Sequence, residues 1–253
     1  MNFLENFAIP QSAHHIELLY GLLILTFLLF VPYLAMVTGS LLLSLRFNKK
    51  GDRTGEKINY DLAKRIIDIV TYNKSLSFAL GIIPVLSMIF SYAQILQGTG
   101  SGIAEDMLIA LVLLIIAIIA LYTYKYSFHF KDILGKVNDE DEEVEKYKVG
   151  SQKLFKKAGK LSLYLTLFTA WVFFAVVSAA RESSMWGSNF FEMLFSVDAI
   201  VSFLGFIVLS DFITAVVVFY AYFRPNTEFK LPEEEKTALK NILLATILLT
   251  VFL

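Results

Sequence analysis

Residues 107–124 read MLIALVLLIIAIIALYTY, eighteen positions without one charged side chain. A helix needs about 20 mostly apolar residues to cross the hydrocarbon core of a bilayer, so this stretch predicts a membrane span. Similar apolar segments recur roughly at Ile16–Leu45, Leu76–Leu96, Leu161–Ala180, Phe190–Phe223 and Ala238–Leu253. The sequence therefore predicts an all-α, polytopic integral membrane protein with six transmembrane helices, forming a single domain over 1–253.

The composition of the 253 residues agrees with this class. Hydrophobic residues make up 57% of the chain and charged residues 18%, whereas soluble domains have about 45–50% and about 25%. So much apolar surface excludes a disordered chain. The absence of cysteine excludes a disulfide scaffold, a cysteine zinc module and a thiolate-ligated iron–sulfur protein. A net charge of −1 gives no electrostatic case for binding nucleic acid, so the lipid bilayer is the expected partner.

The basic residues give the predicted topology. Eight lie in 46–75, nine in 125–160 and four in 224–240, which accounts for 21 of the 22, and Arg181 is the remaining one. Six crossings place these three segments on one side, and the positive-inside rule makes it cytoplasmic, with the N-terminus outside. We therefore expect 46–75 and 125–160 to be cytoplasmic loops.

Two further expectations concern the first of these loops and the end of the chain. Apolar residues at helical spacing from Ile58 to Val70 predict an amphipathic helix lying on the inner membrane surface. The sequence ends inside an apolar run, at Thr250–Leu253. Either the sixth helix stops within the bilayer or the protein continues beyond residue 253, and we favour the second.

Four acidic residues are candidate proton or quinol contacts. Asp198 and Asp211 lie inside the fifth apolar segment, where ionisable groups are costly and mark functional positions by default. They are thirteen positions apart, which predicts ~20 Å along a helix axis and largely different faces. Glu105 and Asp106 begin the third segment, where a helix N-terminus favours negative charge.

The three histidines limit how haem could be held. His14 and His15 lie at the predicted outer end of the first segment, whereas His129 lies past the inner end of the third. This separation excludes an internal bis-histidine haem within the sequence. His14 or His15 with a methionine from the outer half remains open as a haem ligand, although an interfacial histidine pair explains them more simply. The candidate methionines are Met107, Met185 and Met193.

Four stretches resemble a known family. They are Phe27–Gly39 (FLLFVPYLAMVTG), Arg53–Gly55 (RTG), Leu62–Arg65 (LAKR) and Phe78–Ile82 (FALGI). They are similar to the N-terminal helices of subunit I of the cytochrome bd quinol oxidases. Two haem-ligating histidines of that family would fall on Phe27 and near Ser196, so the chain resembles a distant, degenerate relative that lacks the usual haem ligands.

The resemblance implies a membrane subunit of a respiratory or electron-transfer complex in the bacterial inner (plasma) membrane. Its expected role is a scaffold with a quinol contact, as a non-catalytic subunit of an oxidoreductase. The implied cofactors are a quinone and haem b, or haem held by a partner subunit, and the implied partners are other membrane or redox subunits.

Two alternatives from other classes remain at this stage. The chain could be a transporter or channel component, with Asp198 and Asp211 lining a polar path. It could also be a redox protein that binds haem at its outer face through His14 or His15. No Walker loop, GxSxG, HExxH or dinucleotide fingerprint is present, so no catalytic residue is assigned.

Overall fold

The computed structural model of the chain describes residues 12–134, 142–225, 227 and 231–251, and every regular element within these ranges is helical. Five helices of this part are long and apolar enough to cross a membrane. They cover Ala13–Thr54, Lys74–Ile95, Ile103–Lys131, Val144–Arg181 and Val197–Phe223. The all-α, multi-pass membrane class is therefore confirmed at this level.

The predicted sixth span corresponds to α9 (Glu233–Val251), which is not among the helices long and apolar enough to cross a membrane. Charged side chains occupy Glu233, Glu234, Glu235, Lys236 and Lys240. They leave the described part of α9 with too short an uncharged stretch for a crossing. α9 packs against α8 (Val197–Phe223) through Leu239 and Leu243, both fully buried.

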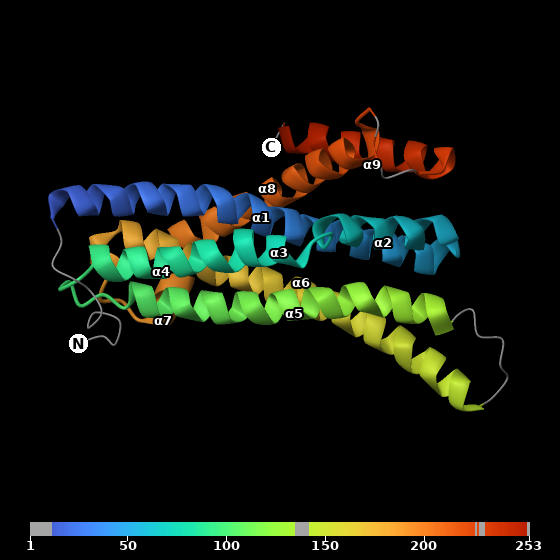
Figure 1. Cartoon of the computed structure of the whole chain (residues 1–253), viewed down its shortest axis with the longest axis horizontal. Coiled ribbons are helices and arrows are strands. Elements are labelled where there is room, and N and C mark those ends of the chain that lie inside the picture. The colour runs from blue at the N-terminus through green and yellow to red at the C-terminus, as the bar shows by residue number, and fades with distance from the viewer. Residues whose placement is uncertain (1–11, 135–141, 226, 228–230, 252–253) are drawn as a thin grey trace.

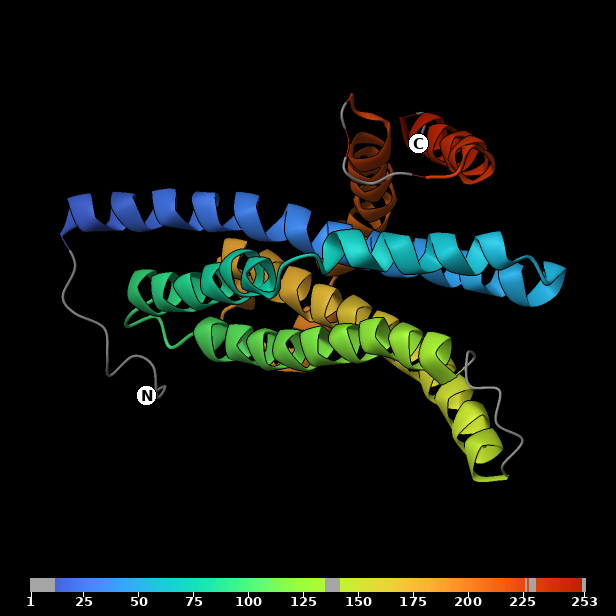
Figure 2. The same ribbon diagram turned by 45° about the vertical axis from the view of Figure 1, so that its right-hand side comes forward.

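The main bundle is built from α1 (Ala13–Thr54), α4 (Ile83–Ile95), α5 (Ile103–Leu134) and α6 (Glu142–Arg181). These helices run side by side, and α5 packs against α6 over a long shared interface (Figure 1). α8 crosses α1 obliquely and projects from the bundle together with α9 (Figures 1 and 2). We call the end with the turn between α4 and α5 the α4–α5 end, and the opposite one the α2 end.

Most of the segment 46–75 is helix rather than loop. α1 is 42 residues long and is capped by Gly55, whose φ of 73° is the left-handed conformation that glycine adopts without strain. The chain then turns back into α2 (Lys57–Val70), which packs along α1. Short α3 (Lys74–Leu76) and a π-helical stretch, Ser77–Ile82, lead from α2 into α4.

The apolar face of α2 is covered by protein, so the expectation that it lies on the membrane surface is wrong. Ile66 and Ile67 are fully buried, in a cluster that includes Leu41 of α1 and Leu121 of α5. The helical spacing of these residues indicated an amphipathic helix correctly. It could not indicate what covers the apolar face, because α1 extends beyond its apolar segment and supplies that cover.

The segment 125–160 is likewise largely helical where it is described. α5 continues to Leu134 and α6 begins at Glu142. The two helices therefore extend past their apolar segments at the α2 end of the bundle. Figure 1 shows the first turns of α6 diverging from α5.

The crossing of α1 and α8 depends on small residues. A Cβ atom added to Gly39 of α1 would overlap the Ser210 carbonyl oxygen of α8, so only glycine allows this approach. The Thr214 hydroxyl donates a hydrogen bond across the crossing to the Met36 carbonyl oxygen at 3.2 Å. Such close backbone contact through small residues is typical of helix packing in membranes.

Candidate functional site

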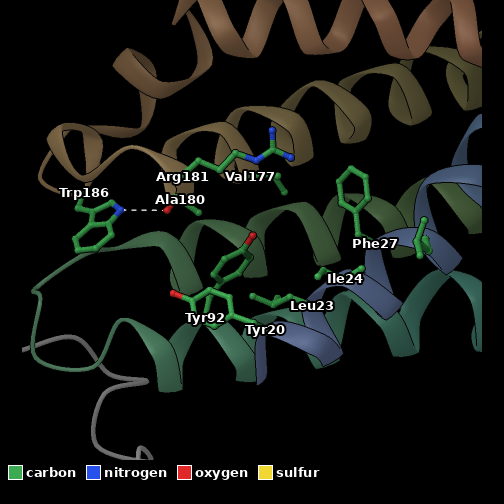
Figure 3. Close-up of a pocket in the computed structure, with 10 residues that line it drawn as sticks. Tyr20, Leu23, Ile24, Phe27, Tyr92, Val177, Ala180, Arg181 and Trp186 are labelled. Carbon is green, nitrogen blue, oxygen red and sulfur yellow. Dashed lines mark hydrogen bonds between the residues drawn. The ribbon is translucent and has the colours of Figure 1, made fainter. Parts of the chain in front are cut away.

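A groove of about 520 Å³ opens at the α4–α5 end, between α1, α4 and α6 (Figure 3). We call it the Arg181 groove, after the cation at the end of α6 that lines it. Its remaining lining consists of five α1 residues, one α4 residue, two α6 residues and one residue of the following turn. These are Tyr20, Leu23, Ile24, Phe27, Leu28, Tyr92, Val177, Ala180 and Trp186.

Aromatic packing and one hydrogen bond shape the groove. Phe27 stacks on Phe173, with ring centroids 6.1 Å apart, and it also meets the edge of Phe174 at 6.5 Å. The Trp186 indole N–H donates to the Ala180 carbonyl oxygen at 3.3 Å, which holds the indole at the end of α6 (Figure 3). The groove walls are therefore fixed by the packed core beneath them.

The groove has a cation, Arg181, from α6 and a phenol, Tyr92, from α4 among its lining residues. Arg181 is the last residue of α6, where a cation complements the negative end of the helix dipole. The Tyr92 hydroxyl points toward the Arg181 side of the groove (Figure 3). An apolar slot with a few converging polar groups is the usual form of a small-molecule site. This one suits a hydrophobic ligand with acceptor oxygens at one end.

A second cavity, of about 400 Å³, shares Arg181 and lies between α6 and α8. Its lining includes Glu182, Asp198 and the hydroxyl residues Ser178 and Ser202. Asp198 is exposed in the first turn of α8, where the helix dipole favours a carboxylate. The structure thus brings Asp198, one of the predicted contacts, beside the groove's cation rather than into the groove.

Asp211 belongs to a different part of the molecule. Its carboxylate forms an ion pair with Arg46 of α1, with 3.4 Å between Nη2 and Oδ2. It is one helix position from Ser210, which contacts Gly39, so the pair lies beside the α1–α8 crossing. Asp211 does not line the cavity that contains Asp198.

Glu105 and Asp106 lie in the first turn of α5, both half-buried. The Asp106 backbone N–H donates to the Gly102 carbonyl oxygen at 2.9 Å, as the first turn of the helix forms. The two carboxylates share the α4–α5 end with the Arg181 groove but line neither of the cavities described above. They fit helix-start positions, as the sequence also suggested.

His14 and His15 are exposed in the first turn of α1. The His14 Nδ1 atom lies 3.8 Å from the Glu17 carboxylate. Met107 and Met193 are buried in the core, and Met185 is half-buried, so the structure does not pair the histidines with the first two. Within the described residues, no group of three or more histidine or acidic side chains is placed to hold a metal ion.

Sequence reasoning missed Arg181 and Tyr92 as site residues and Arg46 as the partner of Asp211. One signal was available, because Arg181 is the one basic residue outside the three basic segments. The pairing of Arg46 with Asp211 joins positions 165 apart. Such a pairing depends on how α8 crosses α1, which the apolar pattern does not specify.

Comparisons with protein-family models, curated proteins and solved structures found no match. The resemblance to cytochrome bd subunit I therefore stays a prediction. Phe27, on which a haem-ligating histidine of that family would fall, forms part of the wall of the Arg181 groove.

Proposed function

We propose that this chain is a membrane subunit of a respiratory or electron-transfer complex and contacts a quinol in the Arg181 groove. It acts there as a scaffold for partner redox subunits rather than as the catalytic subunit. The proposal places it in the bacterial inner membrane with its N-terminus and the α4–α5 end outside.

The observation that carries the proposal is the combination of an apolar groove with polar groups at one end. A quinol has a flat ring with oxygen atoms at its edge and an isoprenoid tail. The ring fits against the Phe27 wall, and the Arg181 guanidinium and the Tyr92 hydroxyl supply hydrogen bonds to its oxygens. The tail leaves along the exposed side chains of Ile24 and Leu28, which face lipid in this arrangement.

The proposal reassigns the acidic candidates. Asp198 stays a candidate proton contact, because its cavity shares Arg181 with the groove. Asp211 becomes a structural residue, because Arg46 neutralises it. Glu105 and Asp106 become helix-start residues. No observation on the described residues favours a transport path, since Asp198 and Asp211 share no cavity described here.

The test is the quinone content of the protein purified in mild detergent, together with photolabelling by an azido-quinone. Arg181→Gln should lower the quinone retained per protein roughly tenfold, because a hydrogen bond to a charged group contributes about 1.5–3 kcal/mol. Tyr92→Phe should lower it less. Ser202→Ala is the matched control, because Ser202 lines the neighbouring cavity but not the groove.

The proposal fails if no quinone and no redox partner accompany the protein. It also fails if the azido-quinone labels residues outside the groove, or if Ser202→Ala lowers retention as much as Arg181→Gln. Phospholipid in the groove in place of quinone, identified by mass spectrometry of the extracted lipids, would likewise overturn it.

A further inference from the structure

The part of α6 that precedes its apolar segment carries lysines on one side. Lys153, Lys157 and Lys160 are separated by four and three positions, and Tyr164 follows four positions later. This spacing places all four on one helix face. We call it the lysine face.

The lysine face points away from the rest of the protein. The buried residues of the same stretch lie on the opposite side of the helix, and they are Phe155, Ala158, Gly159 and Ser162. All three lysines of the lysine face are exposed. The first turns of α6 also diverge from α5 (Figure 1).

Lys156, a neighbour of the lysine face, differs from its three lysines because it pairs with another helix. Lys156 lies between the lysine face and the buried side, and its Nζ atom is 2.9 Å from the Asp52 carboxylate of α1. It therefore ties α6 to the rest of the protein. The three lysines of the lysine face project outward instead.

The position of the lysine face relative to the bilayer follows from helix geometry. Tyr164 is 67% exposed at the start of the apolar segment of α6, where tyrosine typically marks the membrane interface. Lys160 and Lys157 precede it by about 6 and 10 Å along the axis. The headgroup layer on each side of a bilayer is about 5–8 Å thick, so long lysine side chains reach it from both positions. Lys153 is one turn further out, about a Debye length from that layer.

We infer that the lysine face binds the headgroups of anionic phospholipids in the leaflet next to it. Three cations on one exposed face complement a layer of phosphates. Leu161, three positions before Tyr164 and 55% exposed, suits the apolar boundary beneath that layer. The inference concerns the α2 end of the molecule and does not depend on the Arg181 groove.

The test uses the full chain in vesicles of phosphatidylcholine with a minor share of phosphatidylglycerol. Electron spin resonance of spin-labelled lipids measures how strongly the protein immobilises each of the two. The wild type should prefer phosphatidylglycerol, and added salt should weaken the preference. The triple variant Lys153→Gln, Lys157→Gln, Lys160→Gln should lose roughly fivefold in preference for each lysine that meets a headgroup.

The matched control is the triple variant Lys49→Gln, Lys50→Gln, Lys240→Gln, which removes the same charge from exposed positions elsewhere. It should keep most of the preference. Equal loss in both variants would overturn the inference, because net charge alone would then explain it. An unchanged preference for phosphatidylglycerol in the lysine-face variant would also overturn the inference. This holds even if that variant loses a co-purifying acidic protein.

Discussion

The two ends of the bundle are held together in different ways. At the α4–α5 end, phenylalanine rings fill the space between helices, with Phe173 packed against Phe27, Phe30 and Phe174. At the α2 end, hydrogen bonds join the helices: the Asn48 amide donates to the Tyr124 hydroxyl at 2.5 Å. Both ends have apolar packing; at the α4–α5 end it leaves room for a groove, whereas at the α2 end buried hydrogen bonds between side chains add to it.

The largest effect should come from removing an aromatic ring at the α4–α5 end. Phe173 is fully buried, so Phe173→Ala should lower the free energy of unfolding by about 3–5 kcal/mol. Unfolding in mixed micelles measures this change. Phe191→Ala is the control, because Phe191 is 69% exposed and its variant should unfold like the wild type. Similar effects of the two variants would show that this end is not held by ring packing.

Adding one methyl group at the α1–α8 crossing should lower the free energy of unfolding. Gly39→Ala forces a Cβ atom against the Ser210 carbonyl oxygen and should cost about 1–3 kcal/mol of unfolding free energy. Gly205→Ala of α8 is the control, because a Cβ atom there meets nothing within 4 Å. Since alanine is the better helix former, that variant should gain about 0.5–1 kcal/mol. Equal unfolding midpoints for both variants would contradict the close crossing.

A smaller effect should follow from removing one hydroxyl at the α2 end. Tyr124→Phe leaves the buried Asn48 amide without its acceptor, whereas Ser44 keeps its hydrogen bond to the Ala63 carbonyl oxygen. We expect a loss of about 1–2 kcal/mol in unfolding free energy. Tyr164→Phe, at an exposed position, should change nothing measurable. An unchanged stability of Tyr124→Phe would mean that packing alone holds this end as well.

The smallest effect concerns the pH dependence of the contact between α1 and α2. Burial, together with the hydrogen bond that its hydroxyl donates to Asp52 at 2.6 Å, raises the pKa of Tyr60 to about 12. Because the folded state holds this proton more tightly, the contribution of Tyr60 to stability is complete below its ordinary pKa of about 10. That contribution is lost as the pH rises through about 12.

Comparison with Tyr60→Phe measures this contribution. The difference in unfolding free energy between wild type and variant should stay constant up to about pH 10 and shrink above it. The difference in tyrosinate absorbance between the two proteins should show a phenol titrating near pH 12. A phenol titrating near pH 10 would show that the Asp52 contact does not persist in solution.

The sequence predicted the elements better than their contacts. Long uncharged segments predict spans, because an apolar helix of that length has few alternatives to the bilayer. The helical spacing around Ile66 also predicted α2. The apolar pattern carries no information on which surface covers an apolar face, so the cover of α2 by α1 was not foreseen.

The candidate site was predicted less well, for a related reason. Intramembrane acids stand out in a sequence because they are costly, which drew attention to Asp198 and Asp211. Their roles depend on partners from other helices. Arg46 neutralises the second, and Arg181 shares a cavity with the first. The Arg181 groove is formed by residues of three helices, so no local sequence motif could predict it.

The crossing at Gly39 has a consequence for the order of assembly. α1 and α2 are neighbours in the chain, as are α5 and α6, so each pair can form early from local contacts. The Thr214–Met36 hydrogen bond instead joins residues 178 positions apart. This contact can therefore form only after α8 has been synthesised, when the helices of the main bundle are already present.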